Sequence, residues 1–185
     1  MARPAPILFA APHRLAFLAG SLGLAAMALW WPMQLAALHF GWPKPPAGSL
    51  PVALLHAPAL LLQTYPAFIF GFLLTVFPRW MSQPDLIARQ FGPVSGGLAM
   101  GMTASAIGLW TGADTPVWIG FLICAASWAL GLVVLAAVVR ANRRSGKPPC
   151  WHAVSALAAL TIGLGALLLV CAFLIAGDPR LLRWG

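Results

Sequence analysis

Histidine is the residue type in this chain best suited to hold a metal ion or haem, and it occurs at His13, His39, His56 and His152. Each histidine falls at the end of a long apolar run. Neutral imidazole is a ligand that both copper and haem iron accept. Two interpretations follow. Histidines at one depth on neighbouring helices form a metal or haem site, or each histidine caps a helix or bonds a backbone carbonyl near the membrane surface.

The order of the apolar runs sorts the four histidines into two pairs. His13 and His152 are expected on one side of the membrane, where the first and fifth runs begin. His39 and His56 are expected near the opposite side, at the end of the first run and the start of the second. A histidine at a helix start faces the positive end of the helix dipole, which disfavours imidazolium and favours the neutral ligand form.

Two arginines lie close to these positions. Arg14 directly follows His13, and Arg79 ends the second apolar run. A guanidinium group binds carboxylates well, so either side chain suits an anionic haem propionate.

Carboxylates are scarce in this chain. It has no glutamate, and its aspartates are Asp85, Asp114 and Asp178, all outside the apolar runs. No phosphate-binding glycine loop, nucleophile elbow or zinc-protease motif is present. A proton-coupled carrier that works through a buried carboxylate is therefore disfavoured.

The composition indicates a membrane protein. The chain has 185 residues, of which 61% are hydrophobic and 8% charged, against about 25% charged in soluble domains. Its net charge of +8 does not indicate nucleic-acid binding, because the Lys and Arg residues lie in loops, at run ends and in the tails. The expected partner is the lipid bilayer, and no nucleic-acid partner is expected.

We expect an all-α, polytopic bundle of about five membrane-spanning helices, forming one domain over residues 1–185. The expected spans are approximately 15–38, 52–77, 94–110, 117–139 and 151–176. One side then collects Arg3, Arg14, Arg79, Arg89, Arg140, Arg143, Arg144 and Lys147, and the other Lys44, Arg180 and Arg183. The side richer in basic residues is expected to be cytoplasmic, so the N-terminus lies in the cytoplasm.

The third expected span carries small residues at regular spacing. Gly97, Gly101 and Ser105 recur every four residues and therefore share one helical face. Small residues at this spacing let two helices approach closely in lipid. We expect this face to be a helix-packing seam.

A polar break interrupts the second expected span. Pro66 lacks a backbone N–H and frees a carbonyl about one turn earlier, so a kink is expected. Gln63, Thr64 and Tyr65 are the polar groups beside it. The kinked helix either lines a pocket or has its polar groups paired by adjacent helices.

Three segments resemble the NnrS family of bacterial membrane proteins. They are PHRLAFLAG at 12–20, GFLLTVFPRWM at 71–81 and WHAVSALAAL at 151–160. The interval between His56 and Gly71 is also similar to that in the family's second helix. The resemblance runs from about residue 8 to the C-terminus, and GFLLTVFPRWM is its most specific part.

The resemblance implies a multi-pass protein of the bacterial inner membrane. It implies that the protein contains haem and/or copper and takes part in the response to nitric oxide, while leaving open whether it is an enzyme. It implies His13, His56 and His152 as metal ligands and haem-binding residues, with Arg14 and Arg79 as supporting cations.

The chain departs from the family pattern in two ways. Pro58 and Ala59 stand where the family motif has its second histidine and a glutamate. Family members are also about twice as long, so a second copy of this chain or a second membrane half is the expected protein partner. The alternative function is a non-catalytic membrane module or half of a small-molecule permease. In it the histidines cap helices and the prolines act as hinges.

Overall fold

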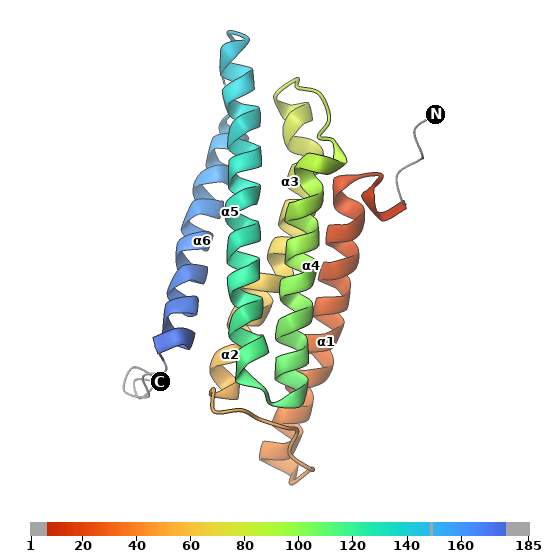
Figure 1. Cartoon of the computed structure of the whole chain (residues 1–185), viewed down its shortest axis with the longest axis vertical. Coiled ribbons are helices and arrows are strands. Elements are labelled where there is room, and N and C mark those ends of the chain that lie inside the picture. Colours follow the sequence, from red (N-terminus) through yellow and green to blue (C-terminus); the bar gives the residue numbers. More distant parts are fainter. Residues whose placement is uncertain (1–6, 149, 177–185) are drawn as a thin grey trace.

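The protein is a bundle of long helices, as a computed structural model covering residues 7–148 and 150–176 shows (Figure 1). The elements in chain order are η1 (Ile7–Phe9), α1 (Pro12–Phe40), α2 (Val52–Pro58), η2 (Ala59–Thr64), α3 (Tyr65–Trp80), α4 (Ala88–Thr111), α5 (Asp114–Arg144) and α6 (Trp151–Ala176). Within the described residues there is no strand, which confirms the all-α prediction.

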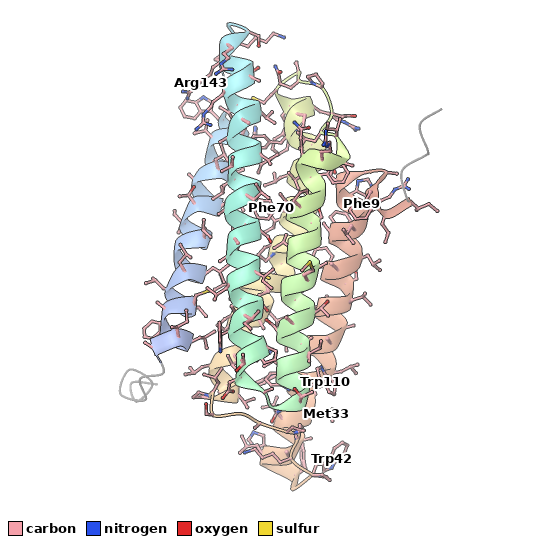
Figure 2. All side chains as sticks on the ribbon, in the orientation of Figure 1. Phe9, Met33, Trp42, Phe70, Trp110 and Arg143 are labelled. Carbon is pink, nitrogen blue, oxygen red and sulfur yellow. The ribbon has the colours of Figure 1, made fainter. Side chains whose placement is uncertain are left out.

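Five rods run side by side along the long axis, because α2, η2 and α3 follow one another as a single helix over Val52–Trp80 (Figure 1). Successive rods alternate in direction. The starts of α1, α4 and α6 and the ends of α3 and α5 therefore lie together, and we call this the basic end. Figure 2 shows Arg143 at the basic end, Trp42 at the opposite end and Phe70 between them. Phe70 is fully buried.

The basic residues support the alternation expected from the sequence. Arg14, Arg79, Arg89, Arg140, Arg143, Arg144 and Lys147 all lie at the basic end, and Lys44 lies in the loop at the opposite end. Arg3, Arg180 and Arg183 lie outside the described residues. The cytoplasmic location of the N-terminus stays a prediction.

Four of the five rods within the described residues are long and apolar enough to cross a membrane: α1, the rod Val52–Trp80, α5 and α6. The fifth, α4, has lower hydropathy because of its many glycine, serine and threonine residues. This agrees with the prediction of about five spans.

The observed helices extend beyond most of the expected spans. The largest difference is in α4, which begins at Ala88 rather than at Val94. Pro93 lies inside this helix, whereas the expected span began after it. The true start is fixed upstream, where the Ile87 N–H donates a 2.9 Å hydrogen bond to the Gln90 side chain.

The small-residue face of α4 packs against α5, as predicted. A Cβ on Gly101 would lie 2.7 Å from the Gly120 carbonyl oxygen, so the two backbones approach too closely for a larger residue. One turn further on, the Ser105 hydroxyl donates to the Val117 carbonyl at 3.3 Å. The seam is therefore a backbone-to-backbone contact of the kind that holds helices together in lipid.

Pro66 is accommodated by a wider helical turn before it. The segment η2 is π-helical, and α3 begins at Tyr65 immediately afterwards. Gln63 donates a 2.8 Å hydrogen bond to Ser105 of α4, and Thr64 donates to the Ala59 carbonyl at 3.1 Å. Tyr65 is 44% exposed on the outer surface. Neighbouring groups thus pair Gln63 and Thr64, which also line a small cavity.

Candidate cofactor site

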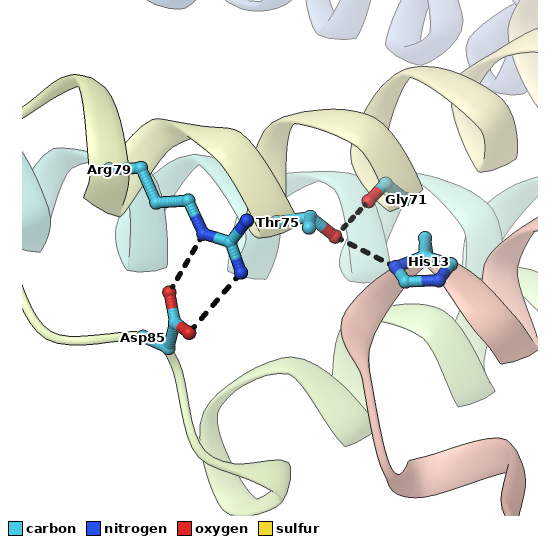
Figure 3. A network of polar contacts seen from close by, with 5 residues as sticks. All are labelled: His13, Gly71, Thr75, Arg79 and Asp85. Carbon is cyan, nitrogen blue, oxygen red and sulfur yellow. Dashed lines mark hydrogen bonds and ion pairs between the residues drawn. The ribbon is translucent and has the colours of Figure 1, made fainter.

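His13 is held by a hydrogen-bonded pair of groups on α3. Its Nδ1 lies 3.4 Å from the Thr75 hydroxyl oxygen, and that hydroxyl donates to the Gly71 carbonyl at 2.8 Å (Figure 3). Since the Thr75 proton is already used, the threonine oxygen accepts from Nδ1–H. A neutral imidazole that donates from Nδ1 carries its lone pair on Nε2. His13 therefore keeps the nitrogen that a metal ion needs.

The two predicted cations lie near His13 in different settings. Arg79 follows Thr75 by one helical turn and so lies on the same face of α3 (Figure 3). It forms a 3.3 Å ion pair with Asp85, and both side chains are about two-thirds exposed. Arg14 is exposed and donates to the Ile7 carbonyl at 3.2 Å. The structure thus places His13 against the face of α3 that also carries Arg79.

An apolar groove begins beside His13. The His13 and Phe17 rings are 5.8 Å apart, and Phe17 lies on the edge of a groove of about 650 Å³ between α1, α3 and α6. Phe68, Phe72 and Trp128 contribute further aromatic walls. Ligand sites commonly have volumes of roughly 300–1,000 Å³ and mostly apolar linings. The groove therefore has the volume and apolar lining of a ligand site, and its wall residue Phe17 lies next to His13.

His152 lies at the same end of the bundle but on another flank of α3. Its side chain is exposed, and its ring lies 6.2 Å from that of Trp80. Trp80 is five residues after Thr75, which corresponds to about 140° around the helix. His13 and His152 therefore lie at the same end of the bundle, as the sequence indicated, but they contact α3 about 7.5 Å apart along its axis and do not face each other.

His56 lies far from both. It stacks on Trp31 with ring centroids 4.3 Å apart and planes 9° apart. Its Nδ1 is buried and has no hydrogen-bond partner. Thr75 comes 19 residues later in the same rod, a rise of roughly 28 Å. His56 therefore belongs to the opposite end of the bundle.

The other expected pair, His39 and His56, is not formed either. His39 is exposed in the last turn of α1, eight residues after the Trp31 that carries His56. Within the described residues, no group of three or more His, Cys, Asp or Glu side chains is placed to hold a metal ion. His13, His56 and His152 are three separate positions, each able to offer one ligand, and their ligand roles stay predictions.

Comparison with protein families places the chain. Residues 7–185 match the family model described as NnrS protein. The chain belongs to the NnrS family. Comparison with curated proteins and with solved structures found no match. In this NnrS-family chain, the GFLLTVFPRWM segment forms most of α3 and supplies Gly71, Thr75 and Arg79 to the face beside His13.

Sequence reasoning missed several residues that hold this NnrS-family site together. Thr75 is 62 residues from His13, and no local pattern links them. The stacking of His56 on Trp31 was not predicted either. The one available signal was indirect: Thr75 precedes Arg79 by four residues inside the most family-like segment. That spacing puts both on one helical face.

Proposed function

We propose that this chain is a haem- and/or copper-binding protein of the inner membrane that acts in the response to, or detoxification of, nitric oxide. Membership of the NnrS family and the four apolar helical segments support the class. The observation that carries the proposal is the bond from His13 to Thr75, which leaves the histidine Nε2 free.

The His13 arrangement has the features of a supported ligand. Metal-binding histidines usually donate their second ring N–H to a fixed acceptor, which sets the tautomer and orients the ring. Thr75 supplies that acceptor, and its own bond to Gly71 fixes the hydroxyl. His13 would hold the cofactor, Thr75 would position His13, and Phe17 would exclude water from one side.

The residues present fit haem held by one histidine better than a copper centre built from several. Haem iron is commonly held by a single histidine, and when bound it supplies an open position that takes nitric oxide. A copper site generally needs more ligands, and the described residues bring no three together. A second protein ligand would come from another copy of the chain or from another membrane segment.

His56 is the second position that supports cofactor binding. Its Nδ1 lacks a partner although the atom is buried, and an unpaired buried polar atom costs about 1–3 kcal/mol. A metal ion or a hydrogen-bonding ligand would remove that cost. Trp31 fixes the plane of the ring by stacking, so the position is ordered before any ligand arrives.

The test is to purify the full chain from cells supplied with haem and copper, then measure the Soret band and the copper content. Haem or copper in a defined ratio to protein is expected. His13→Ala should remove most of it, and His56→Ala a separate share if both positions bind. His152→Ala tests the third predicted ligand. His39→Ala is the matched control, because His39 is exposed in the last turn of α1 and is not among the predicted ligands. A wild-type protein with neither haem nor copper contradicts the proposal.

A second candidate follows from the separation of the histidines. In this candidate the chain is a non-catalytic membrane module or half of a small-molecule permease, and the histidines are structural. The stacking of His56 on Trp31 and the bond of His13 to Thr75 both join helices, which favours it. It predicts that His13→Ala and His56→Ala lower the free energy of unfolding because they remove these contacts, and that His152→Ala lowers it less. It also predicts that a strain relying on the chain keeps its nitric oxide tolerance in folded variants.

A further inference from the structure

A water-sized cavity lies near the middle of the bundle, between α1, η2 and α4. The volume open to the centre of a water-sized molecule is about 20 Å³. Its lining is mostly apolar, with Gln63, Thr64 and Ser105 as the polar exceptions. Gly23 of α1 and Met102 of α4 contribute to its walls. The cavity is thus a small polar space in a part of the chain expected to lie within hydrocarbon.

The polar groups around the cavity have hydrogen-bonding capacity left over. Gln63 is 2% exposed, and its side-chain nitrogen donates to Ser105. The Ser105 proton goes to Val117, and the Thr64 proton goes to Ala59. Both hydroxyl protons are therefore used. What remains is the Gln63 amide oxygen, the second amide proton, and lone pairs on the two hydroxyl oxygens.

This remaining capacity consists mainly of acceptors, so the matching ligand is a small molecule with two donor protons. Water has that chemistry, whereas a diatomic gas does not. A cavity holds one water molecule when this volume exceeds roughly 10–15 Å³ and two to four polar groups surround it. The cavity meets both conditions.

We propose that one water molecule binds in this cavity, donates to Gln63 and Thr64, and completes the hydrogen bonding of η2. The wider π-helical turn places Gln63 and Thr64 side by side at its end. In a bilayer no outside water reaches the Gln63 amide oxygen, so an internal water molecule supplies the donor that it lacks. This inference is independent of haem or copper binding.

Met102 seals the site from lipid. A groove of about 480 Å³ runs along the outer surface between α1 and α4, and Gly23 and Met102 line both this groove and the cavity. Met102 is 6% exposed, and its sulfur lies against Gly23. A flexible methionine fills irregular gaps and can change rotamer, which allows occasional exchange of the trapped molecule.

Gly23 offers a direct way to fill the cavity. A Cβ at this position would lie 3.1 Å from the Met102 sulfur and 3.4 Å from the Thr64 hydroxyl oxygen. The methyl of Gly23→Ala therefore occupies the space assigned to water. Gly96→Ala is the matched control, because a Cβ on Gly96 meets no atom within 4 Å. Both changes gain the same helix propensity.

The experiment is a water-to-amide NMR measurement on the full chain with ¹⁵N-labelled glutamine. Leu62–Gln63 is the chain's Leu–Gln pair, so labelling leucine carbonyl carbons with ¹³C assigns the Gln63 backbone, from which its side-chain amide is traced. A long-lived Overhauser cross-peak between water and the Gln63 side-chain amide is expected in wild type and in Gly96→Ala. It should be lost in Gly23→Ala.

Either of two NMR results would overturn the proposal. One is a Gln63 side-chain signal that shows no water cross-peak in wild type; the other is an undiminished cross-peak in Gly23→Ala. If Gly23→Ala does not fold, Ala106→Val fills the same cavity from α4 and replaces it. Xenon bound in the wild-type cavity, with no water present, would also refute the proposal, because it would show a dry site.

Discussion

The middle of the bundle and its two ends treat polar side chains differently. In the middle, Gln63 bonds to Ser105 across helices, and Ser105 bonds onward to α5. At the ends, His13 keeps a free Nε2, and His56 keeps an unpaired Nδ1. Hydrocarbon offers no competing water, so mid-bundle polar groups serve helix association. The ends offer histidine nitrogens that can ligate a metal ion or haem, whereas the middle offers amide and hydroxyl groups that suit only a small hydrogen-bonding molecule.

Crowding the α4–α5 seam gives the largest expected effect on the middle region. In Gly101→Val the new side chain meets Gly120 backbone at a distance no real Cβ contact tolerates. Overpacking usually costs about 1–3 kcal/mol and sometimes more. The helices must separate, so thermal unfolding in detergent should shift to markedly lower temperature, and the size-exclusion profile should broaden.

Gly96→Val supplies the control for the seam. The same β-branched residue enters the same helix, but a Cβ on Gly96 has no neighbour within 4 Å. This variant should stay close to wild type. Equal destabilisation by both changes would show that helix propensity, not the contact with α5, sets the cost.

Removing the support of His13 gives the next largest effect, now at the basic end. Thr75→Val keeps the side-chain shape but removes the acceptor of the His13 Nδ1–H. Loss of such a support typically lowers metal affinity by about 10- to 100-fold. Haem or copper content measured under limiting cofactor should fall accordingly, while thermal stability changes little.

Thr161→Val tests whether that loss is specific. Thr161 is exposed on α6 and bonds within its own helix, to the Leu157 carbonyl. Its replacement should leave cofactor content unchanged. Unchanged content in Thr75→Val would instead assign the ligand role to another histidine.

The difference between the regions also explains what the sequence could predict. The seam was foreseen because small residues every four positions determine a helix face on their own. Helix number and direction followed from apolar runs and basic loops in the same way. These are local patterns. Each is complete within one stretch of chain.

The candidate cofactor site could not be predicted in this way, because it depends on how several helices pack together. His13 and His152 lie at the same end of the bundle, as expected, but their separation depends on which parts of α3 they contact, and periodicity does not determine that. The sequence predicted a break at Pro66 but not its form, a π-helical segment over Ala59–Thr64 from which Gln63 bonds to Ser105. Asp114, which accepts from the Ser49 backbone N–H at 2.8 Å, likewise pairs with a loop far away in sequence.

Breaking the mid-bundle hydrogen bond should have a moderate effect. Ser105→Ala leaves the Gln63 amide nitrogen without its acceptor. Hydrogen bonds between membrane helices average about 0.6 kcal/mol and reach about 1.7 kcal/mol. A decrease in unfolding free energy within that range is expected, with no change in cofactor content. Ser21→Ala on the exposed face of α1 is the matched substitution and should be neutral.

The Arg79–Asp85 pair gives the smallest expected effect and sharpens the contrast between middle and end. Both side chains are about two-thirds exposed, and exposed ion pairs contribute less than about 1 kcal/mol. Asp85→Asn should therefore leave the melting temperature nearly unchanged. It also frees the Arg79 guanidinium on the face that carries His13, which should favour an anionic cofactor. Cofactor content that is equal or higher fits this picture, whereas a clear loss would mean that the carboxylate itself holds the site.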